Sequence, residues 1–401
     1  MREPLFKRFS EGGTVWLIAI AIALIMPISA LAEEVRIGFL GLENDPRYDA
    51  DLVYARIQIR PQGDPLEGAM LAVDDMKIVA DAVDLEVGVD ARKAANVDEL
   101  SREAKDMIAS GIVFILVDLP ASHLRPLAEA IAGETVTLIN VSAPDMDLRT
   151  ACYPILLHTA SSDRMIADAF TQYLRLRNWT RILLLSGQES RDTAFAAAFR
   201  QSAERLRLTI VSERTFDLST SPEAREQNNV QLLTSGVGDY DLVFIADVDG
   251  DFSRYVSYQT SLPRPVIGNT GLTALEWHWS LERYGAPQVN SRFEASSMEQ
   301  RRMGWQDWSA WVAMRAVITA YAKSRSLTFA DVDGFLRSAR LRLDGSKGVS
   351  MSFRPWSGQL RQPILLATDN ATIAIAPLEG FLHQANTLDT LGIDEREFAC
   401  D

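Results

Sequence analysis

The chain has 401 residues, of which 47% are hydrophobic and 23% are charged, so it is long enough for two folded domains with cores of their own. Its formal net charge of −14 at pH 7 argues against the basic face that nucleic-acid binding requires, and we expect no nucleic-acid partner. The acidic surface otherwise favours solubility and says little about the fold.

The first 32 residues have the pattern of a signal peptide. Three basic residues precede an apolar run over residues 15–28, which is shorter than the roughly 20 residues that cross a bilayer. Ala30 and Ala32 give the small–x–small pattern that signal peptidase recognises, so we expect the mature chain to begin at Glu33 and to be exported to the periplasm. An uncleaved N-terminal anchor is the less favoured alternative, and no stable membrane span is expected.

Strands and helices alternate from the start of the mature chain. Strands are predicted over residues 35–40, 84–89, 112–117 and 136–140, and helices over residues 65–76, 97–110 and 124–131. Pro65 suits the first turn of its helix, and Gly111 suits the end of the next one. The near-continuous apolar run at 112–117 is typical of a parallel strand that is covered on both faces. The series predicts a doubly wound α/β sheet.

A second series of the same kind follows. Its helices are expected over residues 162–176 and 193–206, and its strands over residues 182–185, 208–211, 242–246 and 266–268. The polar stretch 217–227 is expected to be a surface loop, and Ser235 to Gly238 form a Gly-rich loop that precedes a strand rather than a helix, so it is not a phosphate-binding loop.

The last third changes character. Helices are predicted over residues 306–324 and 329–341, and strands over residues 349–353, 363–367 and 372–376. Asp369 and Asn370 predict a turn that makes an antiparallel hairpin of the last two strands. Trp308 and Trp311 lie at helical spacing in the first of these helices, which favours a core position for both.

This order of elements predicts two Rossmann-like lobes that are joined by a hinge and exchange segments. Lobe 1 is expected to comprise residues 33–155 and 276–345, and lobe 2 residues 156–275 and 346–401. In open α/β sheets a ligand binds beyond the carboxyl ends of the strands, so two facing lobes would hold it between them and close on it by a hinge motion.

The chain has two cysteines, Cys152 and Cys400. In an exported protein an isolated pair favours a disulfide, because neither cysteine has the neighbouring Cys or His ligands of a zinc site. Such a bond would tie the C-terminal tail to the middle of the chain.

Catalytic patterns are missing from the sequence. It contains no GxSxG elbow, no HExxH and no Walker loop, and its four histidines are scattered. We therefore expect no enzyme and no cofactor. A hydrolase that uses carboxylates of the cleft is another interpretation, but no motif in the sequence supports it.

Acidic residues follow the ends of several predicted strands. Asp118 follows the third strand and Asp145 the fourth, and Asp247 and Asp249 follow the strand over residues 242–246. There they would line the cleft, where they suit a cationic group or a hard ion such as Ca²⁺. Asp is also common in loops and at helix N-caps, and this structural role is favoured, so no metal site is predicted.

Three further residues are candidates for the ligand-binding site. Tyr48 and Tyr54 lie in the long loop after the first strand, and Asn269 follows the strand over residues 266–268. All three occupy places at the predicted cleft edge of a lobe.

Residues 35–40, 67–75 and 109–115 resemble the type I periplasmic binding proteins, most nearly the leucine/isoleucine/valine-binding family of solute receptors for ABC importers. A narrower resemblance is carried by the C-terminal third. Residues 305–311, 353–363, 380–383 and 388–394 resemble the ABC substrate-binding proteins that are associated with PQQ-dependent alcohol dehydrogenase systems. That association concerns genetic and metabolic context and does not make PQQ a ligand.

The resemblance implies a monomer that binds a small-molecule solute and docks on ABC permease and ATPase subunits. It also implies binding residues in the loops after the third and fourth strands, where Ser122 matches the first loop and Ser142 and Ala143 match the second. Pro144 replaces a hydroxyl residue of the family pattern, and Val248 with Asp249 stands where the family has an aromatic residue. These departures indicate a solute other than a standard aliphatic amino acid, with a cationic or polyol part.

A ligand sensor, or an accessory protein of periplasmic alcohol oxidation, is the alternative to transport. The same fold serves in receptor ectodomains, so the fold alone does not separate these functions.

Overall fold

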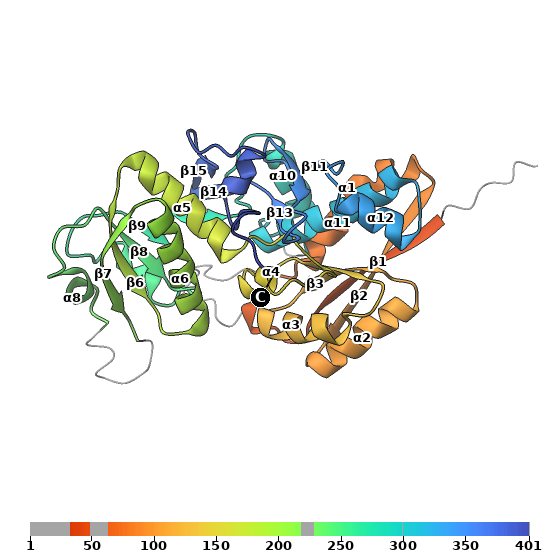
Figure 1. Cartoon of the computed structure of the whole chain (residues 1–401), viewed down its shortest axis with the longest axis horizontal. Coiled ribbons are helices and arrows are strands. Elements are labelled where there is room, and N and C mark those ends of the chain that lie inside the picture. Colours follow the sequence, from red (N-terminus) through yellow and green to blue (C-terminus); the bar gives the residue numbers. More distant parts are fainter. Residues whose placement is uncertain (1–32, 49–62, 218–227, 299, 401) are drawn as a thin grey trace, which may run out of the picture.

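The computed structural model describes residues 33–217, 228–298 and 300–400, with the exception of residues 49–62 (Figure 1). The expected signal peptide, the candidate Tyr54 and most of the expected surface loop at 217–227 lie outside the described residues. Within the described part, no helix combines the length and the apolar character that crossing a bilayer requires.

One sheet of five parallel strands has the order β2-β1-β3-β4-β5. Its strands are β1 (Glu33–Leu42), β2 (Leu85–Ala94), β3 (Phe114–Asp118), β4 (Thr137–Asn140) and β5 (Leu156–His158). Alternate residues of β3 enter two different cores, because Phe114 and Leu116 face one side of the sheet and Ile115 and Val117 the other. The apolar run of this segment is therefore covered on both faces, as predicted.

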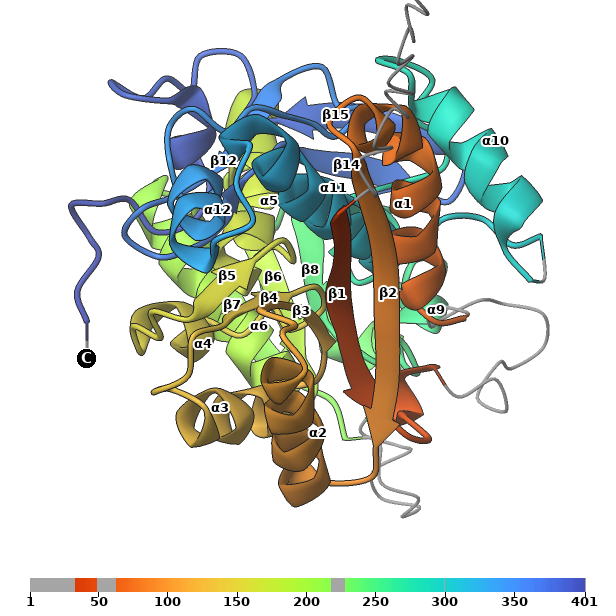
Figure 2. The same ribbon diagram turned by 90° about the vertical axis from the view of Figure 1, so that its right-hand side faces the viewer.

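Helices cover both faces of this sheet. The core around Ile115 includes residues of α2 (Val97–Ala109) and α3 (Ala121–Ala130), and the core around Phe114 includes α1 (Leu66–Asp81), α11 (Trp305–Ser324) and α12 (Phe329–Leu336). Figure 2 shows α1 beside α11 on the same side of β1 and β2. Trp308 and Trp311 of α11 are fully buried, which confirms their predicted core positions.

A second parallel sheet has the order β7-β6-β8-β9. Its strands are β6 (Arg181–Ser186), β7 (Thr209–Thr215), β8 (Leu242–Ala246) and β9 (Val266–Gly268). Helices α5 (Asp163–Arg177) and α6 (Ser190–Arg205) pack on one face, and the short helices α8 (Val230–Thr234) and α9 (Ser253–Val256) lie against the other. An antiparallel sheet of β10 (Thr273–Leu275), β14 (Ile364–Thr368) and β15 (Ala371–Ala376) joins the core that contains α5.

The remaining elements are short connections and additions. They are η1 (Pro46–Tyr48), α4 (Asp147–Thr150), α10 (Ala286–Ser296), β11 (Leu343–Asp344), β12 (Ser350–Phe353), β13 (Leu360–Arg361) and η3 (Thr387–Thr390). Met351, Phe353 and Leu360 enter the core that holds α1 and α11. The described chain thus has two α/β lobes that exchange segments, and the predicted lobe boundaries stay a proposal.

Three connections between the lobes meet at a polar junction: β5 to α5, β10 to α10, and β13 to β14. The backbone N–H of Ser161 donates to Glu276 Oε1 at 2.8 Å, and Gln362 Nε2 donates to the carbonyl of Thr159 at 2.6 Å. Lys347 Nζ donates to the carbonyl of Glu276 at 2.9 Å and to Gln362 Oε1 at 2.8 Å. These bonds join all three crossings, so they define where a hinge would lie.

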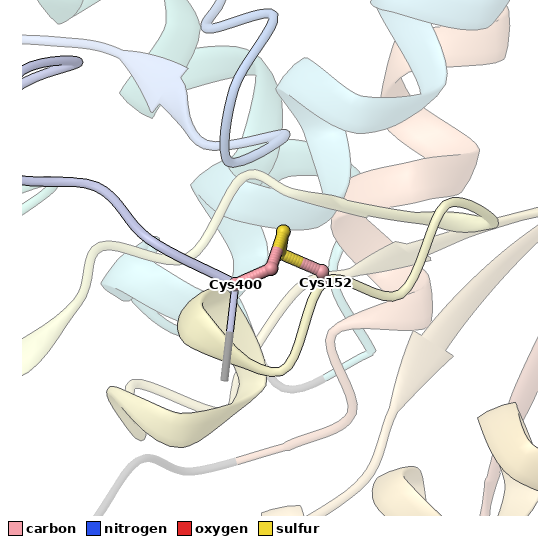
Figure 3. Close-up of a disulfide and its surroundings, with 2 residues drawn as sticks. All are labelled: Cys152 and Cys400. Atoms are coloured by element: carbon pink, nitrogen blue, oxygen red, sulfur yellow. A yellow bond between two sulfur atoms is a disulfide. The ribbon is translucent and has the colours of Figure 1, made fainter.

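The predicted disulfide is present, with Cα atoms of Cys152 and Cys400 5.5 Å apart (Figure 3). Cys152 lies between α4 and β5, at the edge of the first lobe. The tail before Cys400 rests on the second lobe, where the N–H of Gly392 donates to the buried carboxylate of Asp168 at 2.7 Å. The disulfide therefore adds a covalent link between a tail anchored on one lobe and a loop of the other.

One predicted helix is too long. Residues 329–341 were expected to be helical, but α12 ends at Leu336. Ser338 explains the stop, because both its hydroxyl and its N–H donate to the carbonyl of Phe335, at 2.8 and 3.0 Å. These two local hydrogen bonds of Ser338 end the helix, although the apolar periodicity of the sequence continues to Leu341.

Gly68 is required by the close packing of α1 on α11. A Cβ at this position would overlap the carbonyl oxygen of Asp307. We expect Gly68→Ala to destabilise the protein by about 1–3 kcal/mol, because backbone atoms would have to move apart. Gly334→Ala is the matched control: this exposed glycine lies inside α12 with open space around it, so alanine should stabilise by about 0.5–1 kcal/mol. Thermal unfolding of both variants checks the opposite signs, and a neutral Gly68→Ala would contradict this packing.

Candidate functional site

The best-defined polar site lies at the carboxyl ends of β3 and β4, against η1. Arg47 of η1 is its centre. Its guanidinium donates to Asp45 from Nε and Nη2 at 2.9 and 2.6 Å, to Asp118 Oδ1 from Nη2 at 3.0 Å, and to Ser142 Oγ from Nη1 at 2.8 Å. Tyr48 donates its hydroxyl to the same oxygen of Asp118 at 3.0 Å. Tyr48, Asp118 and Ser142, all candidates from the sequence, are thus brought together by a residue that the sequence did not single out.

Asp118 is buried at the floor of this site. Burial raises the pKa of its carboxyl, and the neighbouring Arg47 guanidinium acts in the opposite direction. Burial likewise raises the pKa of Tyr48 well above its ordinary value, and the Asp118 carboxylate adds to the rise. The tyrosine is therefore a neutral hydrogen-bond donor, and the buried carboxylate has a cationic partner in Arg47.

The backbone donors after β4 are already used by the protein. The buried Asn140 accepts the N–H groups of Ser142 and Ala143 on its Oδ1 at 3.2 and 2.8 Å. The carbonyl of Ala143 accepts from Asn140 Nδ2 and from Arg149 Nη1, both at 2.7 Å. Ala143 is thus a structural link in this loop, and its polar atoms have partners within the chain.

A cavity of about 550 Å³ adjoins the site at the ends of β1, β2 and β3. It is large enough for a small metabolite. Its lining combines two aromatic rings, three carboxylates, an amide and an amine, together with backbone and apolar surface: Phe39, Gly41, Leu42, Asn44, Asp45, Pro46, Tyr48, Gly63, Asp64, Lys93 and Asp118. Lys93 is bound to Asp64 at 2.6 Å, so cationic side chains in and beside the cavity are held by carboxylates.

The corresponding edge of the second lobe is also acidic. Asp247 Oδ2 accepts the N–H groups of Phe252 and Ser253 at the start of α9, at 2.9 and 2.6 Å. Asn269 Oδ1 accepts the N–H of Asp247 at 2.9 Å, and Asp192 Oδ1 accepts that of Val248 at 2.7 Å. Asp247 and Asn269 therefore have the structural roles that Asp and Asn commonly take in loops.

Among the described residues, no three Asp, Glu, His or Cys side chains come together in a group that could hold a metal ion. Asp249 is exposed at the same edge as Asp247. The acidic loops are a source of negative charge at the carboxyl ends of the strands in the second sheet.

Asp192 gives this edge a measurable pH dependence. Burial raises its pKa to about 6 from an ordinary value of 3.8, and Asp247, Asp249 and Glu189 add to the rise. Because the folded state then holds this proton more tightly than the unfolded chain, the contribution of Asp192 to stability falls as the pH rises from 3.8 to about 6. We expect Asp192→Asn to remove that fall, so the variant should gain stability relative to the wild type between pH 4 and pH 7. Unfolding midpoints of both proteins over this range provide the test, and a pH-independent difference between them would contradict it.

An ion pair joins the two lobes beside the site. Arg191, at the start of α6, donates to Asp145 Oδ1 from Nη1 at 3.1 Å and to Asp163 Oδ1 from Nη2 at 2.9 Å. Asp145 belongs to the loop after β4 in the first lobe, and Asp163 begins α5 in the second. The candidate Asp145 therefore contacts the opposite lobe through a side chain that the sequence did not single out.

Ser122 lies apart from these residues. Its side chain is exposed and contacts His123 Nδ1 at 3.1 Å, and it does not line the cavity. The sequence also gave no indication of Arg47, Asn140 or Arg191. Their roles depend on contacts across the fold, and the one available signal was that Arg47 adjoins the candidate Tyr48.

Neither a family model nor a curated protein matches the sequence. Solved structures do resemble the fold. An ABC transporter substrate-binding protein from Desulfitobacterium hafniense, in complex with Leu, gives a TM-score of 0.66 at 16% identity and covers 85% of this chain and 99% of its own. A branched-chain amino acid ABC transporter periplasmic ligand-binding protein from Burkholderia xenovorans LB400 gives 0.68 at 14% identity, covering 85% and 95%.

A solute-binding protein of an ABC transporter from Rhodopseudomonas palustris BisB5, in complex with 3,4-dihydroxybenzoic acid, gives a TM-score of 0.59 at 13% identity and covers 84% of this chain and 93% of its own. These similar structures are described as substrate- or ligand-binding proteins. The two parallel sheets, each covered on both faces by helices, are therefore the two lobes of the type I periplasmic binding protein fold.

Proposed function

We propose that this protein is the periplasmic solute-binding component of an ABC transporter and captures a small polar solute between its two lobes. The observation that carries the proposal is the polar site of Arg47, Tyr48 and Asp118 beside a cavity of about 550 Å³. It lies at the carboxyl ends of parallel strands, which is where ligands bind in open α/β sheets. The expected signal peptide supports export.

Capture would follow from contacts that are made only when the lobes are closed. A solute that touches both the Tyr48–Asp118 site and the acidic edge at Asp192 would favour the closed state by its extra contacts there. The pair of Arg191 with Asp145 is a cross-lobe contact that is present without a solute, and it would help to hold the closed lobes together. Closure would then present a permease with a surface that the open form lacks.

The alternative function is that of a ligand sensor, or of an accessory protein in a PQQ-dependent alcohol dehydrogenase system. The resemblance of residues 305–311 and 353–363 favours this context. A permease and ATPase gene pair beside the gene would support transport, and a sensor kinase in that place would support sensing.

The direct test is thermal unfolding of the mature protein, from Glu33 onward, with amino acids, amines, short alcohols and their acids, polyols and PQQ. A solute at 100 times its Kd stabilises by about 2.7 kcal/mol, which is a clear shift in the unfolding temperature. We expect one class of organic solute to give this shift. Asp118→Asn should bind that solute more weakly, with a Kd at least about tenfold higher, because the buried carboxylate at the floor of the site is lost.

Asp81→Asn is the control, since this exposed carboxylate at the end of α1 pairs with Lys77 near the amino ends of β1 and β2, at the opposite end of the sheet from the site. It should bind the solute as the wild type does. If no solute of any class shifts the unfolding temperature, or if Asp118→Asn leaves the shift unchanged, the proposed function is contradicted.

A further inference from the structure

We infer that lobe 1 recognises its solute through a protonated amine or guanidinium, and that the Arg47 side chain fills this cationic subsite when no solute is bound. The subsite is formed by Asp45, Asp118 and Ser142. This inference rests on the proposed function and specifies the class of solute.

The geometry around Arg47 is that of a bound guanidinium. Each of its three nitrogens donates to an oxygen of the subsite: Nε to Asp45, Nη1 to Ser142, and Nη2 to both Asp45 and Asp118. Nη2 also donates to the carbonyl of Asp118 at 3.2 Å. All of these partners accept hydrogen bonds, so the subsite matches a planar, multiply donating cation.

Arg47 is placed so that its side chain could leave without unfolding the site. Its backbone N–H is held separately by Asp45 Oδ1 at 2.9 Å, and its side chain is 29% exposed, whereas those of Asp45 and Asp118 are 7% and 6% exposed. The acceptors are therefore fixed in the lobe, and the donor reaches solvent. A rotation of the Arg47 side chain would free the subsite while the short helix η1 stays in place.

Charge decides which solute could replace Arg47. An incoming cation would keep Asp45 and Asp118 paired throughout the exchange. A carboxylate would add a third negative charge and leave two largely buried carboxylates without a cation, which is strongly unfavourable. A neutral polyol would also leave both charges unpaired. The exchange therefore selects a cation.

The surroundings offer little to a carboxylate. The N–H groups of Ser142 and Ala143, which are the nearest backbone donors after β4, are bonded to Asn140. On the opposite lobe, Asp192 lies with Asp247 at an acidic edge, where burial and the neighbouring negative charges raise the pKa of Asp192. The strand ends of both lobes thus carry acidic groups, which favours positive charge on a solute that lies between them.

The first experiment removes the internal cation. In Arg47→Ala, methylguanidinium at millimolar concentration should raise the unfolding temperature saturably. Methylurea, its neutral isostere, and acetate should not. Wild-type protein, whose subsite is filled, should respond at least about tenfold more weakly to methylguanidinium. The double variant Arg47→Ala/Asp118→Asn should lose most of the response, because one of the two carboxylates of the subsite is gone.

Equal stabilisation of Arg47→Ala by methylurea or acetate, or no saturable response to methylguanidinium, would overturn the inference. A second measurement uses the wild type and does not depend on the folding of a variant. Amines should bind more tightly than the matching amino acids that carry a carboxylate, with agmatine at least about tenfold tighter than arginine, and leucinol likewise tighter than leucine.

Tighter binding of the amino acids, or binding only of a polyol or an organic acid, would contradict the cationic subsite and leave the proposed solute-binding function intact. A complete lack of binding by every solute class would contradict the proposed function. The methylguanidinium response of Arg47→Ala would still report on the subsite in that case.

Discussion

Replacing Asp389 by alanine is expected to destabilise the protein by about 3–5 kcal/mol. Asp389 of η3 is completely buried and accepts from Arg354 Nε at 2.8 Å and from Arg361 Nε at 2.9 Å. The Arg354 side chain is 1% exposed, so removal of the carboxylate leaves a buried guanidinium without its counter-charge. Arg354 also donates to the carbonyls of Leu388 and Leu391 and thereby holds the C-terminal tail against the turn between β12 and β13.

Asp239→Ala is the matched control for this variant. Asp239 also pairs with two arginines, Arg181 and Arg264, at 2.8 and 2.9 Å, but its side chain is 55% exposed. Water replaces the lost carboxylate there, so we expect little change in the free energy of unfolding. Chemical unfolding of both variants separates the two cases, and equal effects would refute the importance of burial at Asp389.

Loss of the disulfide is the second change that we expect to destabilise the protein strongly. The bond closes a loop between residues 248 positions apart, and a long loop restricts the unfolded chain strongly. We expect Cys152→Ser to lower the free energy of unfolding by about 2–5 kcal/mol. Reduction of the wild type with a strong reductant should reproduce the effect, and the double variant Cys152→Ser/Cys400→Ser should match the single one.

The tail adds a structural reason for this expectation. The carboxylate of Glu397 lies 4.0 Å from Arg164 on α5, so only a short stretch separates a contact with the second lobe from Cys400. Without the bond, the last residues should detach and become accessible to carboxypeptidase. An unchanged unfolding curve for Cys152→Ser, together with an uncleaved tail, would show that the bond contributes nothing.

The parts of the fold that the sequence predicts well are those with a strong local signal. The apolar run at Leu242–Ala246 is β8 in the structure, as predicted, and the hydroxyl of Ser162 caps the predicted helix α5. Short strands such as β10 and β13 were not predicted. β10 pairs with β14, about ninety residues further along the chain, so nothing in its own three residues marks it as a strand.

The candidate site likewise contains residues that the sequence indicates and residues that it does not. Tyr48 and Asp118 were found because residues after strand ends meet at one edge of a parallel sheet, and Ser142 was found through the resemblance to the solute-receptor family. Arg47 was missed because an arginine in a loop usually faces solvent, and its partner Asp118 is 71 positions away. Asn140 was missed because it reads as the last residue of a strand, while its function is to bond the following turn.

Closure of the two lobes over a solute is most directly tested by small-angle X-ray scattering. The mature protein is compared with and without the solute that stabilises it in thermal unfolding, and Arg191→Ala serves as a variant without the cross-lobe ion pair. We predict a smaller radius of gyration with the saturating solute, and a smaller decrease for Arg191→Ala at the same concentration. Identical scattering of the wild type in both conditions would contradict capture by closure.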